Sequence, residues 1–364
     1  MTKNMHSFPI STDDITTELL TDVLSEHRPG LVVESFQLAN TELCGDGFAS
    51  TADQVVLDLK YAEGSAPDMP GRVMLKTMLV SPHAPKAMYL NEVRFYHDIR
   101  PHIELETPQC YASLFDPQNG QFGIIMDDLN VKGASFPKAT QALNLQQISG
   151  LVKTLARLHA QFWNSSCLKN EFSWIPTPCS GGMFDIFSKF GLGIITEQIR
   201  KHPFKQSLID PIGLNLDQMW QIMWEVERHF EVYQPRTILH GDSHIGNTYL
   251  LPDGSGGLLD WQLIVMGCWA HDLAYLIVTG LETEFRQRHE RDLIALYLEE
   301  LKRRGVTDIP SKNEAWLLYR KAIIWGLVIG WLITPPENYG IDITKANISR
   351  LVNAVQDLES FNAS

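Results

Sequence analysis

The chain has 364 residues, 44% of them hydrophobic and 20% charged, which is enough apolar material for one large domain or two ordinary ones and excludes a disordered chain. Its 30 Lys and Arg face 43 Asp and Glu, a formal net charge of −13. The basic surface that recruits phosphates is therefore missing, and no nucleic-acid partner is expected. The five cysteines are scattered without a C-x-x-C pair, which favours reduced thiols in a cytoplasmic protein.

No membrane-spanning segment is expected. The N-terminal residues carry no apolar signal core. The longest apolar run, Ala322–Ile333, is 12 residues long and is followed closely by Pro335–Pro336. This run is too short to cross a bilayer, so we expect it to form a buried core helix.

The first 130 residues favour strands. Gln54–Tyr61 and Arg72–Val80 are rich in β-branched and alternating apolar residues, and the turn-rich segment between them predicts a hairpin. Gln121–Met126 is another short apolar strand. Between these strands, Lys86–Ile99 predicts a helix that carries the following residues on one side: Met88, Glu92, Phe95 and Tyr96.

From about Asn144 the pattern becomes helical. One apolar face recurs at helical spacing through Ile148, Leu151, Val152, Leu155, Leu158 and Phe162. Further helices are predicted at Phe184–Arg200, Asp217–Tyr233, Glu282–Arg304, Lys312–Ile333 and Ile343–Phe361. The chain is thus expected to be α+β, with a small sheet-rich lobe followed by a larger helical lobe.

The polar segment LHGDSHIGNTYL, Leu239–Leu250, interrupts the helical part. It places two histidines, an aspartate, a serine and an asparagine between two short apolar runs. Polar side chains at this density indicate a loop held by rigid strands, where chemistry is usually found.

Two hydrolytic readings of this segment remain open. His240, Asp242 and His244 could chelate zinc or iron, although no further ligand cluster stands out downstream. Ser243 could be a hydrolase nucleophile, although the glycines of a G-x-S-x-G elbow are absent.

A third reading is phosphoryl transfer, with Asp242 as the base and Asn247 as a magnesium ligand. It requires a second carboxylate on the metal, a strand lysine for the nucleotide phosphates and a helix glutamate to hold that lysine. Asp260 follows Leu258–Leu259, Lys76 lies within VMLKTML, and Glu92 follows Lys76 by 16 residues on the predicted helix. The combination of these residue types in this order favours phosphoryl transfer.

The blocks HGDSHIGN, LLDWQ and HDLAYL resemble the aminoglycoside phosphotransferase/choline kinase superfamily, a branch of the protein-kinase-like fold. The DWQ triplet is most similar to the ecdysteroid-kinase-like branch and its bacterial relatives. The resemblance implies a bilobal fold: an antiparallel-sheet nucleotide-binding lobe over residues 1–126, a hinge at 127–130, and a mostly helical catalytic and substrate-binding lobe over 131–364.

The resemblance also implies roles for the residues of these blocks. Asp242 corresponds to the catalytic aspartate, and His240 to the histidine that supports the catalytic loop. Asn247 and Asp260 correspond to the magnesium ligands. The remaining matches are structural supports: His244, the second loop histidine, and Asp272, the aspartate that braces the loop. For Asp272, a helix N-cap is an equally good reading of the residues alone.

The cofactors implied are ATP and Mg²⁺, with Mn²⁺ as an alternative. Lys76 would bind the nucleotide phosphates and Glu92 would fix its ammonium group. Gly45 and Gly47 lie where the family has its phosphate-covering hairpin, without a full G-x-G-x-x-G. The segment expected to meet the adenine is the hinge, formed by Met126, Asp127, Asp128 and Leu129.

The acceptor is expected to be a small hydroxylated molecule, apolar or sterol-like. Lys169–Arg200, where substrate contacts are expected, balances three acidic residues (Glu171, Asp185, Glu197) against three basic ones (Lys169, Lys189, Arg200). A polycation would gain little there, whereas aromatic side chains could bury an apolar alcohol. The candidates are Trp174, Phe184 and Phe187. A pseudokinase that binds nucleotide or ligand without turnover is the alternative.

Overall fold

The computed structural model describes residues 9, 11–43, 51–79 and 84–363. Within them the chain forms two compact units. The first comprises Met1–His102 and Pro108–Ala134, and the second Ile103–Thr107 and Ser135–Ser364. The first unit therefore includes the expected hinge residues, and the second takes in a short segment, Ile103–Thr107, that the sequence did not indicate.

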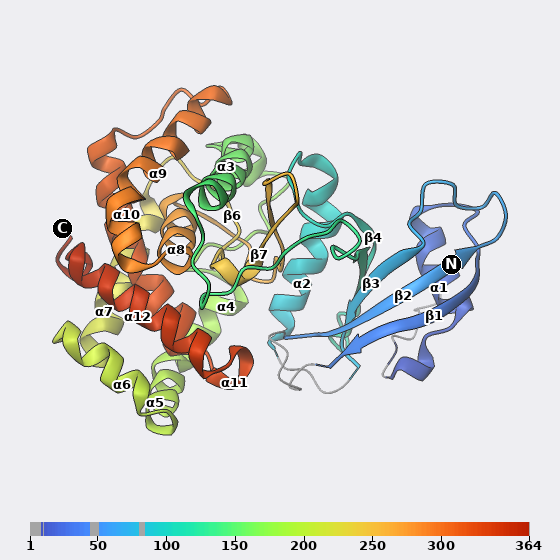
Figure 1. Cartoon of the computed structure of the whole chain (residues 1–364), viewed down its shortest axis with the longest axis horizontal. Coiled ribbons are helices and arrows are strands. Elements are labelled where there is room, and N and C mark those ends of the chain that lie inside the picture. Colours follow the sequence, from blue (N-terminus) through green and yellow to red (C-terminus); the bar gives the residue numbers. More distant parts are fainter. Residues whose placement is uncertain (1–8, 10, 44–50, 80–83, 364) are drawn as a thin grey trace. The chain divides into compact units, whose positions relative to one another are not determined.

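A five-stranded antiparallel sheet is the framework of the first unit (Figure 1). Its strands, in spatial order, are β1 (Val33–Glu42), β2 (Asp53–Tyr61), β3 (Arg72–Thr77), β5 (Phe122–Asp127) and β4 (Cys110–Phe115). The predicted hairpin is confirmed, since β2 pairs with β3 in register from Asp53 opposite Thr77 to Asp58 opposite Arg72. The alternating apolar residues of β2 account for this sheet, because every second side chain faces the core.

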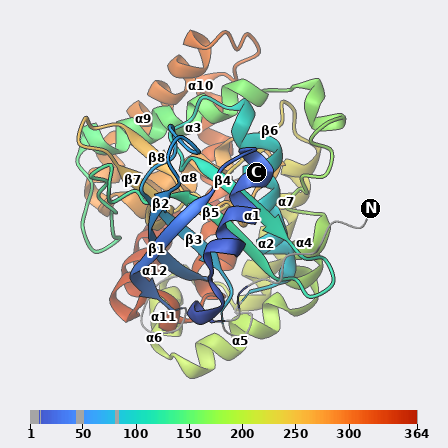
Figure 2. The ribbon, with the colours of Figure 1, turned by 90° about the vertical axis from the view of Figure 1, so that its right-hand side faces the viewer.

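Helix α1 (Thr17–His27) covers one face of this sheet (Figure 2). Leu20 and Leu24 of the helix join Leu57 of β2 in one buried cluster. Thr16 caps the helix by accepting a hydrogen bond from the Leu19 backbone N–H at 3.1 Å. The sequence reading did not identify this helix, although the cap and its apolar spacing were visible.

A second helix follows β3 along the chain. It begins as α2 (Lys86–Arg94) and continues with a wider turn through Phe95–Ile99. Glu92, Phe95 and Tyr96 are all buried on the predicted side. This helix fixes the position of Glu92 relative to the sheet.

The second unit is largely helical. Its helices are α3 (Leu145–Phe162), α4 (Gly181–Ile186), α5 (Leu192–Lys201), α6 (Phe204–Ile209), α7 (Leu216–Val232), α8 (Ala270–Gly280), α9 (Thr283–Arg303), α10 (Lys312–Trp325), α11 (Pro336–Tyr339) and α12 (Ile341–Asp357). The predicted apolar face of α3 is buried, and Asn144 and Gln147 cap its start reciprocally. Together with the antiparallel sheet of the first unit, this confirms the expected α+β class.

Two short antiparallel ladders lie among these helices. β6 (Thr237–Leu239) pairs with β9 (Val265–Gly267), and β7 (Thr248–Leu250) pairs with β8 (Gly256–Leu258). All but two residues of these four strands are buried. The ladders leave residues 240–247 as the loop between β6 and β7, and residues 259–264 as the connection between β8 and β9.

One helical stretch, Lys312–Leu332, is long and apolar enough to span a membrane by length and composition. In the structure 72% of its most apolar window is buried against the rest of the chain. This burial agrees with the core helix predicted around Ala322–Ile333.

Candidate active site

The loop between β6 and β7 turns sharply at Gly241. This residue has φ of +81°, a left-handed conformation that side chains rarely adopt. A Cβ atom there would lie 1.9 Å from the backbone oxygen of Leu263. Glycine is therefore required by both the conformation and the close approach of the β8–β9 connection, and it brings that connection against the loop.

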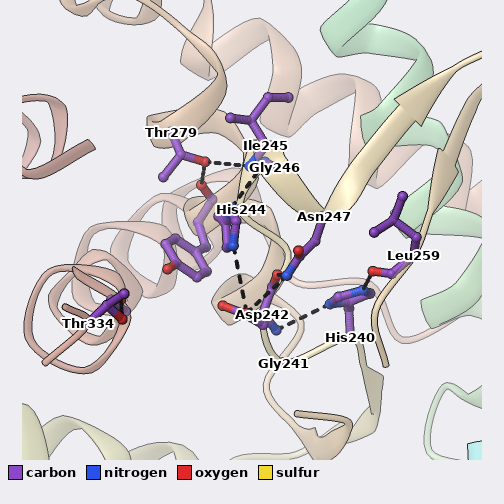
Figure 3. A network of polar contacts seen from close by, with 12 residues as sticks. His240, Gly241, Asp242, His244, Ile245, Gly246, Asn247, Leu259, Thr279 and Thr334 are labelled. Atoms are coloured by element: carbon purple, nitrogen blue, oxygen red, sulfur yellow. Dashed lines mark hydrogen bonds and ion pairs between the residues drawn. The ribbon is translucent and has the colours of Figure 1, made fainter. Parts of the chain in front are cut away.

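Asp242 and Asn247 are joined within this loop (Figure 3). The Nδ2 group of Asn247 donates to the backbone oxygen of Asp242 at 2.8 Å and to its Oδ2 at 3.0 Å. Both amide protons of Asn247 are thereby directed at Asp242, so Asn247 presents Oδ1 as its remaining polar atom. Asp242 itself is partly exposed, with 23% of its side chain accessible.

Asp260 follows β8 and adopts φ of +66°, an uncommon conformation for a side-chain-bearing residue. Burial and the nearby charge of Asp260 raise the pKa of Asp242 to about 7. A cation would offset the unfavourable charge that Asp260 imposes on the Asp242 carboxylate. Together with Oδ1 of Asn247 the two carboxylates offer the oxygen ligands that Mg²⁺ prefers, so these residues fit a magnesium ion.

His240 connects the two loops. Its Nδ1 accepts a hydrogen bond from the Asp242 backbone N–H at 3.3 Å, and its Nε2 lies 2.9 Å from the backbone oxygen of Leu259. The ring is fully buried against Trp261, and burial lowers the pKa of His240. The structure thus places His240 as a positioning residue that ties Asp242 to the segment carrying Asp260.

His244 lies on the other side of Asp242, with Nε2 3.7 Å from its Oδ2 (Figure 3). Its Nδ1 accepts a hydrogen bond from the Gly246 backbone N–H at 3.0 Å. Burial lowers the pKa of His244 to about 3, so the ring is neutral near pH 7. Three aromatic rings pack around it: Tyr275, Trp331 and Tyr339.

Asp272, the third residue of α8, holds the backbone of the β6–β7 loop by hydrogen bonds. Its Oδ2 accepts from the His240 backbone N–H at 2.6 Å and its Oδ1 from the Gly241 N–H at 3.0 Å. The helix N-cap is Trp269, so the N-cap reading of Asp272 is wrong. Burial by itself raises the pKa of Asp272, but the hydrogen bond and charge of His159, together with the charges of His240 and His271, outweigh burial and lower it.

His159 was not identified from the sequence. It lies on α3, fully buried, with Nε2 3.2 Å from Asp272 Oδ2 and Nδ1 2.7 Å from the Tyr297 hydroxyl. The available signal was a histidine within the apolar face of an amphipathic helix, which indicates a buried polar partner without saying which one.

Within the first unit, Lys76 and Glu92 form a buried ion pair. The Lys76 Nζ lies 2.8 Å from Glu92 Oε2 and 2.9 Å from Oε1. Lys76 sits on the central strand β3, opposite Gln54 of β2 and Ile124 of β5. The structure therefore joins the lysine and the glutamate that the sequence spacing had paired.

The expected nucleotide contacts of the first unit are described only in part. Gly45 and Gly47 lie outside the described residues. Met126 and Asp127 are the buried end of β5, and the Asp127 backbone N–H already donates to the Gln109 backbone oxygen at 3.0 Å. The side chain of Asp127 is held by Tyr111 at 2.6 Å. For an adenine edge, the backbone groups from the carbonyl of Asp127 through Asp128 to the amide of Leu129 are the candidates.

Two of the three expected substrate residues lie in one aromatic cluster. Phe187 packs edge-on against Trp325 and Phe184 against Trp224, with ring centroids 6.2 Å and 5.4 Å apart. Both phenylalanines are partly exposed. Trp174, also partly exposed, lies in the loop before α4. The structure thus gathers Phe184 and Phe187 into one aromatic cluster with Trp224 and Trp325.

The metallohydrolase reading receives no geometric support. Within residues 9, 11–43, 51–79 and 84–363, no three His, Cys, Asp or Glu side chains are grouped as a metal site. The ring nitrogens of His240 face Leu259 and the Asp242 amide, while Nδ1 of His244 faces Gly246. The two histidines are therefore engaged in holding the loop.

Comparison with known proteins agrees with this arrangement. Residues 75–305, more than half of the chain, match the family model described as the phosphotransferase enzyme family. The chain belongs to that family. The phosphotransferase fold covers nearly the whole chain: a choline kinase from Cryptosporidium parvum Iowa II superposes with a TM-score of 0.54 and 13% identity, covering 94% of this chain and 96% of that one.

A second structure, spectinomycin phosphotransferase APH(9)-Ia in complex with ADP and spectinomycin, superposes with a TM-score of 0.50 and 15% identity, over 95% and 99% of the two chains. These similarities establish the fold. In sequence, the chain described here is 23% identical over 255 residues to a Caenorhabditis elegans protein called uncharacterized oxidoreductase dhs-27. The match covers 60% of this chain but only 27% of that protein.

Proposed function

We propose that this small-molecule phosphotransferase transfers the γ-phosphate of ATP to a hydroxyl group, with Mg²⁺ as the metal. The observation that carries the proposal is the joining of Asp242 to Asn247, with the charge of Asp260 close enough to raise the Asp242 pKa. Phosphoryl transfer needs an oriented hydroxyl and neutralised phosphate charge more than covalent help from the protein.

In this mechanism Asp242 accepts the hydrogen bond of the acceptor hydroxyl and directs its oxygen at the phosphate. Asn247 fixes the Asp242 carboxylate through Nδ2 and, with Asp260, would hold Mg²⁺ by its side-chain oxygen. The bound metal supplies neutralisation of the phosphate charge. His240 and Asp272 keep the loop in place during the reaction, because their hydrogen bonds fix the backbone on either side of Gly241.

Lys76 would bind the phosphates that are not transferred, and Glu92 would hold its ammonium group in position. The adenine would pair with backbone groups from Asp127 to Leu129. The spectinomycin phosphotransferase APH(9)-Ia is found in complex with ADP, which supports the choice of an adenine nucleotide.

For the acceptor we propose an apolar, sterol-like alcohol, in keeping with the DWQ resemblance to ecdysteroid-kinase-like proteins. Phe184 and Phe187 support it, because their partly exposed rings lead into a buried aromatic cluster. Burying apolar surface against such rings stabilises a complex by about 25 cal/mol per Å².

The test is ADP release with ATP and Mg²⁺ against a panel of sterols, aromatic alcohols, choline and kanamycin, with the product identified by mass spectrometry. We expect a phosphorylated alcohol and strict dependence on Mg²⁺ or Mn²⁺. Nucleotide binding with no phosphorylated product from any member of the panel would favour the pseudokinase alternative. Zinc-dependent hydrolysis would overturn the proposal.

A further inference from the structure

A second buried polar pair lies beside the active site, formed by Glu227 of α7 and His271 of α8. Glu227 is 1% exposed and His271 2% exposed. Neither carboxylate oxygen of Glu227 and neither ring nitrogen of His271 has a hydrogen-bond partner among the residues that the structure describes. Their closest approach, from Nε2 to Oε1, is 3.6 Å, longer than a hydrogen bond.

The pair is unusual because buried polar groups are nearly always hydrogen-bonded. A charge that is buried with incomplete partners destabilises a fold, and the Coulomb attraction to one neighbour seldom offsets the lost hydration. An arrangement with four unsatisfied polar atoms therefore suits a site whose hydrogen bonds are completed by a ligand.

The position of the pair connects it with the acceptor. His271 directly precedes Asp272, which accepts two backbone hydrogen bonds from the catalytic loop. A positive charge on His271 also favours the ionised form of Asp242. The His271 ring packs on Trp325 at 5.0 Å, and Trp325 contacts Phe187, one of the two partly exposed phenylalanines.

We infer that Glu227 and His271 form a recognition subsite for a second, uncharged hydroxyl group of the acceptor, remote from the one that is phosphorylated. This inference rests on the proposed function and names the class of acceptor: a diol or polyol with an apolar body. A hydroxyl placed between Nε2 and Oε1 would bridge their 3.6 Å separation by donating to one member and accepting from the other.

The chemistry of the pair favours a hydroxyl over an ammonium group. A carboxylate and an imidazole that share one proton have no net charge as a pair, whichever member holds it. A hydroxyl both donates and accepts, so it satisfies the pair whichever member holds the proton, whereas an ammonium only donates. The surrounding rings of Trp224, Trp325, Phe184 and Phe187 suit the hydrocarbon part of such an acceptor.

The test compares alcohols that share a skeleton and differ by one hydroxyl: androstanediol with androstanol, and benzenedimethanol with benzyl alcohol, with choline as the cationic probe. Affinity is measured by calorimetry with a non-hydrolysable ATP analogue and Mg²⁺, and kcat/KM by ADP release. We expect the wild-type protein to prefer one diol over its mono-ol by at least about tenfold, because a missing hydroxyl leaves buried groups unpaired.

Glu227→Gln and, separately, His271→Phe should reduce that preference to within about twofold. The matched control is Glu231→Gln, one turn further along α7, where the carboxylate already lies 3.5 Å from Arg236. This control should keep the wild-type preference. Thermal unfolding of each variant verifies folding. Glu227→Gln should melt at or above the wild-type temperature, since it replaces a buried carboxylate whose oxygens have no hydrogen-bond partner in the described part of the chain.

Several results would overturn the subsite. They are equal binding of diol and mono-ol by the wild type, no binding of any diol, a preference that survives in Glu227→Gln, and a preference for choline that is lost in Glu227→Gln. A fall in melting temperature of Glu227→Gln with selectivity intact would instead make the pair a structural ion pair. Because calorimetry needs no turnover, the absence of product would count against the proposed function alone.

Discussion

Asp272 and His271 are neighbours in sequence, yet their buried side chains differ in how many hydrogen bonds they make. Asp272 receives hydrogen bonds from the backbone of His240 and Gly241 and a contact from His159, so each oxygen has a partner. The side chains of His271 and Glu227 are just as buried, and among the described residues neither has a hydrogen-bond partner. The difference shows how one helix can fix a loop with one residue and leave the next available for a ligand.

The physical reason lies in the stability that each arrangement provides. A fully satisfied buried network rigidifies the segment it holds, and a catalytic loop must be held within fractions of an ångström. An unsatisfied pair lowers stability until something binds it. Both arrangements can be tested by substitution, beginning with Asp242, whose loop is held by the hydrogen bonds of Asp272.

The largest effect is expected for Asp242→Asn. The substitution removes the group that accepts the proton of the acceptor, and such base and orientation effects are about 10² to 10⁴-fold. We expect kcat to fall by this factor while nucleotide affinity stays close to wild type. Asp308→Asn, an exposed substitution between α9 and α10, is the control. A variant with more than half of the wild-type turnover would show that Asp242 is not the catalytic residue.

Asp272→Asn should cause the next largest change. The amide would direct N–H groups at the donors of His240, Gly241 or His159, leaving a buried network unsatisfied. Breaking a buried charged pair by removing one partner costs about 3–5 kcal/mol. Denaturant unfolding should report a loss of this order together with a fall in kcat. Unchanged stability would mean that the loop is held by its other contacts.

Glu227→Leu provides the matching test for the pair that Glu227 of α7 forms with His271 of α8. Replacing a buried, incompletely paired carboxylate with an apolar side chain of similar size is often neutral or stabilising by about 1–4 kcal/mol. We therefore expect the free energy of unfolding to stay level or rise in the absence of acceptor. A loss of unfolding free energy as large as that of Asp272→Asn would show that the Glu227–His271 pair stabilises the fold as the Asp272 network does.

The smallest effect concerns Lys205 of α6, a fully buried residue. Its Nζ donates to three backbone oxygens at and just beyond the end of the wide-turn helix Gly326–Leu332, those of Trp331, Leu332 and Thr334. Burial lowers the pKa of Lys205 to about 8 from an ordinary 10.5. Between these values the unfolded chain binds more protons than the folded one, so this group makes stability rise with pH.

The measurement is thermal unfolding of wild type and Lys205→Met at several pH values from 7.5 to 10.5. The stability of the wild type relative to the variant should increase through this interval. If the difference instead shrinks with rising pH, the three carbonyl contacts outweigh burial and the pKa of Lys205 is raised.

Much of the fold and part of the site followed from local sequence. Apolar periodicity identified the β2–β3 hairpin and α3, because alternation and helical spacing are read within a few residues. The helix α1 was missed even though Thr16 caps it, and the N-cap reading of Asp272 was wrong because Trp269 is the N-cap of α8. Both errors concern helix starts, where short polar side chains fit several conformations.

The sequence by itself determined which residue types were available: Asp242 and Asn247 share one loop, and Lys76 and Glu92 stand on a strand and the helix after it. Tertiary structure alone decided the rest. His159 meets Asp272 across 113 residues, and Glu227 meets His271 between two helices. Such contacts depend on how helices pack, and a periodic pattern reports only that a side chain is buried. The packing of the folded chain decides which polar group the buried side chain meets, and whether it meets one.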